Sequence, residues 1–151
     1  MSRLLLLIAG LSITTALLAQ NNKYDSALAR KMGADEYGMK HYVVAFLKEG
    51  PVKITDSVKR AQIMSAHLKN IGRMAKEGSL VIAGPFLDNS NLAGIYIFNV
   101  TTVEEARKLT STDPAVKAGV FEMELHPWYG SAALMQVTPI HYTIQKTSIT
   151  D

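Results

Sequence analysis

The sequence predicts an α+β domain with the element order β-α-β-β-α-β, the split βαβ or ferredoxin-like arrangement. Two observations predict this order: short runs rich in β-branched and aromatic residues alternate with amphipathic stretches, and glycine or proline separates them. The chain has 151 residues, 48% of them hydrophobic and 19% charged, which suits one domain with a packed core. We expect an antiparallel sheet with both helices on one face.

The first predicted strand is the apolar run HYVVAFL at residues 41–47, and the breakers Gly50 and Pro51 follow it. A long amphipathic helix is predicted over residues 57–77, because its apolar residues recur at spacings of three and four. The predicted core face of this helix carries Ala61, Met64, Leu68, Ile71 and Ala75. Gly78 is expected to end the helix.

The second and third strands are predicted at residues 80–86 and 94–100, and a polar turn joins them. Gly84 and Pro85 lie inside the second of these strands. Because proline cannot donate a hydrogen bond to a strand ladder, we expect the chain to bend or bulge at this pair.

The second helix is predicted to begin at Thr102, which forms a capping-box pattern with the glutamate three residues later. It should end before Asp113, because the proline that follows disfavours helical backbone in the residue before it. Residues 120–126 alternate apolar and polar side chains, as in a half-buried antiparallel strand. We expect Pro127 to interrupt this strand, and residues 140–144 are a candidate for a further strand.

The N-terminus has the layout of a secretory signal peptide: a basic start at Arg3, an apolar run and small residues at its end. Cleavage is expected near Ala19, leaving a periplasmic or secreted protein with no stable membrane span. The alternative is a retained membrane anchor, although residues 4–19 are short for a span of about 20 residues. The predicted segments are a signal peptide (1–19), a leader (20–40), one domain (41–130) and a C-terminal extension (131–151).

Composition and missing motifs exclude several classes of protein. The chain has no cysteine, which rules out disulfides, thiolate catalysis, cysteine-ligated zinc and iron–sulfur clusters. Lys and Arg number 16 against 13 Asp and Glu, without a basic run, so no nucleic-acid partner is expected. The phosphate-loop, dinucleotide, serine-hydrolase and zincin motifs are absent, and the 4 histidines lack metal-ligand spacing. We expect neither a cofactor nor a metal.

His67 is the main candidate for chemistry, because it lies on the predicted apolar stripe of the long helix. A histidine there is either a hydrogen-bonded core residue or a proton carrier that faces a pocket, and the sequence leaves both readings open. Asp113 is a candidate partner that would set the tautomer of His67, and it is equally a common turn residue before proline.

Three further residues are candidates for the wall of a substrate site. Gly84 and Pro85 would let the backbone approach a ligand, or would only form a bulge. Trp128 would line a pocket or pack at a dimer seam. The second face of the sheet should be apolar and uncovered, so we predict a homodimer through that face.

Several blocks of the sequence together resemble the YCII-related domain family: AHL at 66–68, LVIAGPF at 80–86, EEA at 104–106, DPAVKAGV at 113–120 and ELHPWYG at 124–130. The resemblance covers about residues 41–130 and implies a ferredoxin-like fold paired into a dimeric α+β barrel. It also implies a His–Asp pair in a pocket, carried here by His67 and Asp113. One related member is a dehydrochlorinase of a chlorinated hydroxyquinol, so acid–base elimination belongs to the chemistry that the resemblance implies. The signal segment and the C-terminal extension depart from the family pattern.

Two functions are open on this basis. The first is a small cofactor-free enzyme that uses His67 and Asp113 for lyase- or isomerase-like acid–base chemistry on a small cyclic or aromatic molecule. The second is a non-catalytic small-ligand-binding or accessory protein of the cell envelope, with the same two residues as a buried structural pair. A haem-binding barrel with an axial histidine is a third option without a second supporting feature.

Overall fold

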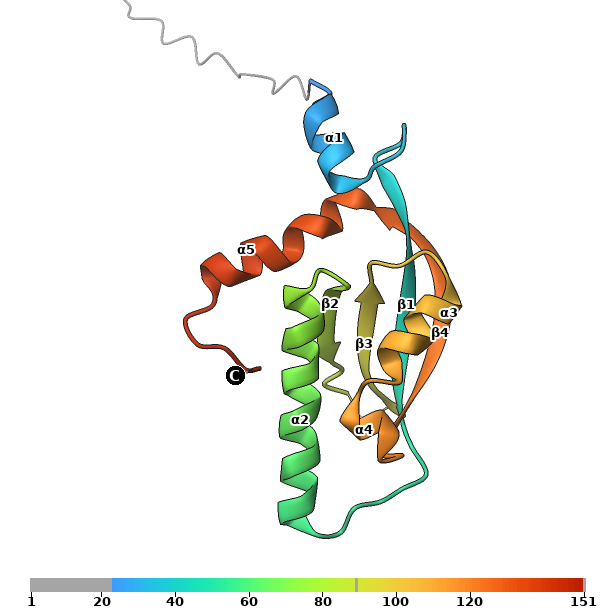
Figure 1. Cartoon of the computed structure of the whole chain (residues 1–151), viewed down its shortest axis with the longest axis vertical. Helices are drawn as coiled ribbons and strands as arrows, with labels where there is room; N and C mark the ends of the chain where they lie inside the picture. Colours follow the sequence, from blue (N-terminus) through green and yellow to red (C-terminus); the bar gives the residue numbers. More distant parts are fainter. Residues whose placement is uncertain (1–22, 89, 151) are drawn as a thin grey trace, which may run out of the picture.

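The computed structural model describes residues 23–88 and 90–150 (Figure 1). The predicted signal peptide lies outside the described residues. In order, the elements are α1 (Ser26–Met32), β1 (Met39–Glu49), α2 (Ser57–Lys76), β2 (Leu80–Pro85), β3 (Leu92–Phe98), α3 (Val103–Thr110), α4 (Pro114–Lys117), β4 (Phe121–Ser131), the 3-10 helix η1 (Ala132–Gln136) and α5 (Val137–Ile144).

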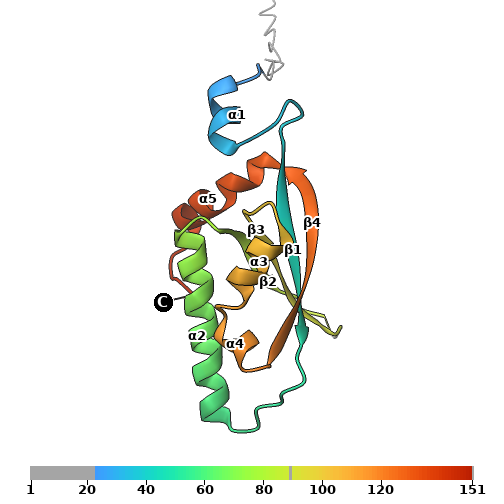
Figure 2. The ribbon, with the colours of Figure 1, turned by 45° about the vertical axis from the view of Figure 1, so that its right-hand side comes forward.

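The four strands form one sheet in the spatial order β2-β3-β1-β4, and each neighbouring pair is antiparallel. Helices α2, α3 and α4 lie together on one face of this sheet (Figures 1 and 2). The predicted α+β class, the order of the main elements and the one-sided helix layer are therefore confirmed. The short helix α4, which follows Asp113, was not predicted.

The main core lies between the sheet and these helices. Its buried members are Val43, Ala45, Leu47, Met74, Leu80, Tyr96, Phe98 and Ala106. Side chains from alternate positions of β1 and from β3 thus meet α2 and α3, as expected when one face of each strand is buried. The capping box is also confirmed, because the Thr102 hydroxyl and the Glu105 carboxylate each accept from the other residue's backbone N–H.

The core-facing side of α2 differs from the predicted stripe. Its buried residues are His67, Asn70, Gly72 and Met74, whereas Ala61 is exposed and Leu68 is half-buried. One reason is that the first turns of α2 extend past the ends of β2 and β3 (Figure 1), so that apolar residues there have little to pack against. A second reason is that polar partners, described below, allow His67 and Asn70 to be buried.

Two predictions about proline positions are wrong. Pro127 does not interrupt β4, which continues to Ser131 opposite Met39 of β1. β4 is an edge strand, so a residue without an N–H is tolerated where its donor side would face away from the neighbouring strand. Pro85 likewise ends the edge strand β2 without breaking it, and the irregularity of the β2–β3 ladder lies between Leu80 and Ile82 instead.

The C-terminal extension is also different from the prediction. Residues 140–144 belong to helix α5 and not to a further strand. η1 leads into this helix, and its Leu134 and Met135 pack against Tyr42, Val44 and the other apolar residues of the second sheet face. The chain after α5 then turns back toward α2 (Figure 1).

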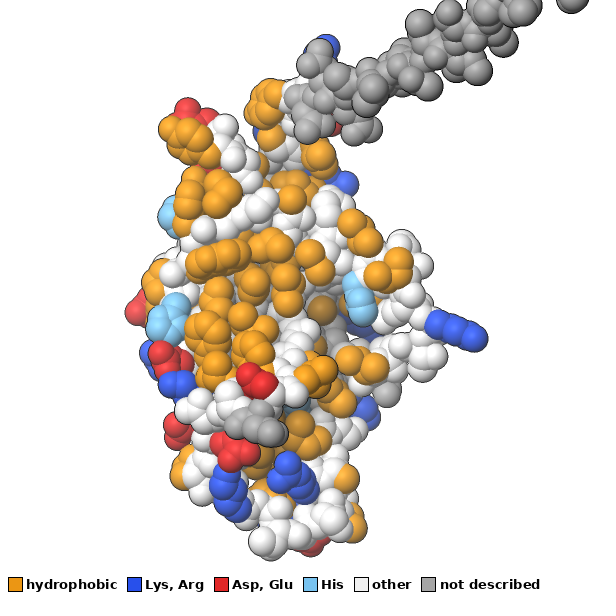
Figure 3. Space-filling model, turned by 180° about the vertical axis from the view of Figure 1, so that it is seen from behind, with side chains coloured by type: hydrophobic (Ala, Val, Ile, Leu, Met, Phe, Trp, Pro, Cys, Tyr) orange, Lys and Arg blue, Asp and Glu red, His pale blue; other side chains and the backbone are white. Residues whose placement is uncertain are grey.

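The second face of the sheet is apolar, as predicted, and the rear view shows a broad hydrophobic surface on it (Figure 3). Apart from the end that η1 covers, no helix of the described residues lies over it, and Phe46, Ile82 and Ile95 are half-buried there. Among the described residues, no helix is long and apolar enough to cross a membrane.

Candidate functional site

The site begins with His67, which α2 carries into the core with only 5% of its surface exposed. Asp56 caps the N-terminus of this helix, since its carboxylate accepts from the backbone N–H groups of Val58 and Lys59 at 2.9 and 3.1 Å. Met74, two turns after His67, anchors the same side of α2 in the core and is 1% exposed. The imidazole is therefore fixed by a helix that is secured along its length.

Asp113 lies in the short connection between α3 and α4 and reaches His67 from there. α3 ends at Thr110, before Asp113 as predicted, and Asp113 is the N-cap of α4 with Pro114 in the first turn. Its Oδ1 accepts from the backbone N–H of Ala115 at 2.8 Å, and the residue is fully buried. The sequence feature taken as a turn signal thus also directs a carboxylate inward.

The two side chains meet at hydrogen-bonding distance. Nδ1 of His67 lies 2.8 Å from Oδ2 and 3.0 Å from Oδ1 of Asp113. An ionised carboxylate can only accept hydrogen bonds, so the proton is on Nδ1, and Nδ1–H donates a hydrogen bond to Asp113. In the neutral imidazole, Nε2 is then the nitrogen with a free lone pair.

Tyr96 completes the arrangement and was not predicted from the sequence. It lies on the central strand β3, is 2% exposed, and places its hydroxyl 3.4 Å from Nε2 of His67. Burial raises the pKa of the Tyr96 hydroxyl far above its usual range, and the negative charge of Asp113 adds to this rise. The hydroxyl therefore stays protonated and is a donor toward Nε2. Its one sequence signal is the alternation of GIYIF, which places Tyr96 on the opposite strand face from its neighbours.

Apolar rings surround this polar chain. The ring of Phe121 lies 5.3 Å from that of His67, and Phe98 contacts Tyr96 edge-on at 5.6 Å. Among the described residues, no buried side-chain nitrogen or oxygen lacks a hydrogen-bond partner. The site is thus a buried, fully paired Tyr–His–Asp chain, in which a shift of a proton at one end changes the electrostatic environment at the other end.

A second polar cluster holds the backbone just before Asp113. The Arg73 guanidinium donates to the side-chain oxygens of Asn70 at 2.9 Å and Thr112 at 3.0 Å, and the Thr112 hydroxyl lies 3.2 Å from the Asn70 oxygen. Arg73 also pairs with Glu77 at 2.6 Å. These contacts tie α2 to the residue adjacent to Asp113, so they position the carboxylate.

The other predicted site residues lie elsewhere. Trp128 is on the second face of the sheet, where its ring lies 5.8 Å from that of Tyr42, with the sheet between it and His67. Gly84 pairs with Ile95 near the end of β2, and Pro85 beside it is exposed. The structure brings together His67 and Asp113 but does not bring these three residues to them. Their roles in substrate binding stay predictions.

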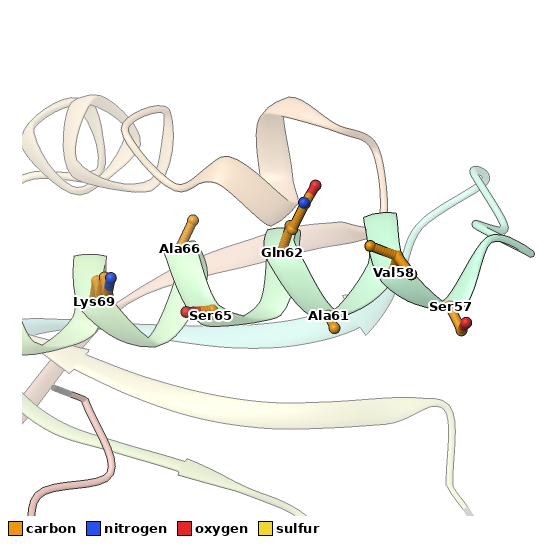
Figure 4. Close-up of a pocket in the computed structure, with 7 residues that line it drawn as sticks. All are labelled: Ser57, Val58, Ala61, Gln62, Ser65, Ala66 and Lys69. Atoms are coloured by element: carbon orange, nitrogen blue, oxygen red, sulfur yellow. The ribbon is translucent and has the colours of Figure 1, made fainter.

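A wide depression on α2 is lined by residues of its first turns, including Ser57, Ala61 and Ser65, whose side chains point outward (Figure 4). His67 does not belong to that lining. Within residues 23–88 and 90–150, no three His, Asp or Glu side chains gather as a metal site would require.

The YCII-related domain model matches residues 39–129, more than half of the chain. The chain belongs to the YCII-related domain family. The matched segment runs from the first residue of β1 almost to the end of β4, and so contains His67, Asp113 and Tyr96. The family match ends before η1 and α5.

Among solved structures, the chain is similar to the 5-chloro-2-hydroxyhydroquinone dehydrochlorinase from Burkholderia phenoliruptrix AC1100, in complex with 2,5-dihydroxybenzoquinone. The two share 18% identity with a TM-score of 0.44, over 59% of this chain and 93% of that one. Among curated proteins, none matches the sequence.

Proposed function

We propose that this YCII-related protein is a small cofactor-free enzyme that performs acid–base chemistry with His67. The observation that supports this most is the hydrogen bond of 2.8 Å between Nδ1 of His67 and the fully buried Asp113. This bond fixes one tautomer and leaves Nε2 as the proton acceptor, as a general base requires. We propose a lyase- or isomerase-like reaction on a small cyclic or aromatic molecule.

In an elimination, Nε2 would take a proton from a carbon of the substrate. The electron pair of that C–H bond would form a double bond, and the leaving group would depart with its own electron pair. Asp113 would stabilise the imidazolium that forms, because its carboxylate already binds Nδ1–H. A positioned base of this kind supplies about 10²–10⁴-fold in rate, which suits an activated substrate.

The Tyr96 hydroxyl limits access to Nε2. Its distance of 3.4 Å makes it a long hydrogen bond, and a substrate would have to displace it or receive a proton from it. Because His67 is only 5% exposed, the substrate would enter by movement of the side chains around the pair. This proposal therefore predicts that Tyr96→Phe changes the rate without removing the base.

The test is a screen of the purified protein for elimination and isomerisation of small cyclic substrates. Wild type is compared with His67→Gln, which keeps side-chain polarity but removes the base. His41→Gln is the matched control, since His41 is an exposed histidine on β1. The proposal expects loss of activity of at least 10²-fold in His67→Gln alone. Equal activity in His67→Gln and wild type would contradict it.

A second candidate function is non-catalytic binding of a small ligand, with His67 and Asp113 as a structural pair. The observation that favours it is that the pair is buried and already satisfied. This alternative expects His67→Gln to lower the melting temperature while no substrate is turned over. It also expects a bound ligand to raise the melting temperature of both proteins.

We further propose that two copies associate through the second face of the sheet. Phe46 and Ile95 belong to its apolar surface, and Trp128, whose ring packs on Tyr42, is 39% exposed. Glu124 binds both Lys48 and His126 at its rim. Light scattering after gel filtration tests this: wild type and the surface control Val58→Asp should be dimers, and Phe46→Asp a monomer. A monomeric wild type would overturn the proposal.

We also propose that residues 1–19 direct export and are removed near Ala19. Support comes from the basic start, apolar run and small-residue end of this segment. Intact mass of the protein from the periplasm or medium of its own cell tests this. A mass that includes Met1 would contradict cleavage.

A further inference from the structure

A cavity of about 190 Å³ lies between α2, β2, α5 and the chain that follows α5. α2 and β2 supply its apolar floor, including Ile71, Ala75 and Ile82. The opposite wall includes Val137, His141 and Tyr142 of α5. His67 and Asp113 do not line it, and its α5 wall lies outside the segment that matches the family.

Contacts on both sides build this cavity. The Thr138 hydroxyl donates to the backbone oxygen of Val81 at 3.1 Å and so fixes α5 to the irregular part of the edge strand β2. On the other side, Thr150 lies directly on Gly72. A Cβ atom at Gly72 would stand 2.7 Å from the Thr150 hydroxyl oxygen, so only glycine lets the C-terminal segment approach α2 this closely.

The chemistry of the lining is neutral. Among residues 23–88 and 90–150, no Lys, Arg, Asp or Glu lines the cavity, and residues 125–145 contain none of these four residue types. An ion would enter such a site without a compensating charge and would lose its hydration. The α5 wall does carry hydrogen-bonding side chains, because His141 and Tyr142 line the cavity together with Gln145 at the end of α5.

The volume points to a ligand of one ring. An apolar cavity of about 150 Å³ holds a benzene molecule. At about 190 Å³, this cavity has room for such a ring with a small substituent. We propose that it is a binding site for an uncharged monocyclic aromatic molecule with a hydroxyl substituent, the ring on the α2–β2 floor and the hydroxyl at the α5 wall.

The probe for this site is 4-methylphenol, followed through the methyl signals of the full protein in ¹H–¹³C NMR. Saturable shifts are expected at Ile71, Ala75, Ile82 and Val137. Benzoate, a charged ring of similar size, should bind at least tenfold more weakly. Absence of saturable shifts with 4-methylphenol, or equal affinity for benzoate, would overturn the proposal.

Two substitutions fill the cavity from opposite walls: Ala75→Leu from α2 and Val137→Phe from α5. The matched control is Ala61→Leu, because Ala61 is an exposed alanine on the same helix as Ala75 and does not line this cavity (Figure 4). Each filling variant should weaken 4-methylphenol binding at least tenfold, while Ala61→Leu should bind as wild type does. If folded Val137→Phe and Ala61→Leu bind the probe equally, it binds elsewhere and the proposal is wrong.

Discussion

Replacing Asp113 with alanine removes two interactions of its buried carboxylate. One is the N-cap bond to the Ala115 N–H at 2.8 Å, and the other is the pair of contacts with Nδ1 of His67. Loss of a cap costs about 1 kcal/mol. A buried donor left without a partner costs a further 1–3 kcal/mol or so. We therefore expect Asp113→Ala to lower the free energy of unfolding by about 2–4 kcal/mol.

Asp56→Ala is the matched control for this prediction. Asp56 caps α2 through two backbone N–H bonds but is exposed and has no histidine partner. It should cost about 1 kcal/mol. The difference between the two variants measures what the unpaired His67 costs.

Urea unfolding followed by far-ultraviolet circular dichroism gives both values. With a slope of about 1–3 kcal/mol per M, the midpoint of Asp113→Ala should fall by on the order of 1 M relative to wild type. A third variant, Asp113→Asn, keeps an oxygen that can cap α4, so its urea midpoint should lie between those of Asp113→Ala and Asp56→Ala. If Asp113→Ala were no less stable than Asp56→Ala, the buried pair would contribute nothing beyond a cap, and the reasoning would be refuted.

Three further predictions concern pH and backbone space. The pKa of Tyr96 is raised in the folded protein, so the protonated hydroxyl contributes its full stability below the unfolded pKa of about 10 and loses it as the pH rises above that value. In urea titrations, Tyr96→Phe should therefore lose less stability than wild type between pH 9 and 11. Equal losses in the two proteins would argue against the buried hydroxyl. The hydrogen bond from Thr102 lowers the pKa of Glu105, so the ionised carboxylate stabilises the fold above its unfolded pKa of about 4.3, and this stabilisation disappears as the pH falls through the lower folded value. The melting temperatures of wild type and Glu105→Gln should therefore differ at pH 7 and converge near pH 2. A Cβ atom at Gly50 would lie 2.2 Å from the backbone oxygen of Gly119, whereas one at Gly84 would meet nothing within 4 Å. Gly50→Ala should therefore lower the free energy of unfolding by about 1–3 kcal/mol, and Gly84→Ala should change it little. Thermal unfolding of the two variants measures this difference.

The fold was predictable where a local signal and the tertiary structure agree. The capping box at Thr102 and the alternation of residues 120–126 each specify an element without reference to the rest of the chain. Pro127 and residues 140–144 were mispredicted because their state depends on position: a proline is tolerated in an edge strand, and the apolar 140–144 segment packs as a helix beside β2.

The site was predictable only in part for the same reason. His67 and Asp113 stand out because each is a polar residue at a position with a local structural meaning, a helix stripe and an N-cap. Tyr96 carries no such sign, since a tyrosine within an apolar strand is ordinary and only the fold brings it to Nε2. Trp128 lies on the opposite face of the sheet from His67, which sequence proximity to a strand end cannot reveal.

The claim that most depends on this structure is that Asp113 holds the proton of His67 on Nδ1. Long-range ¹H–¹⁵N NMR of the imidazole measures this directly, at a pH where the ring is neutral. We expect the Nδ1–H form in wild type and its loss in Asp113→Ala. A proton on Nε2 of His67 in the wild-type protein would contradict it.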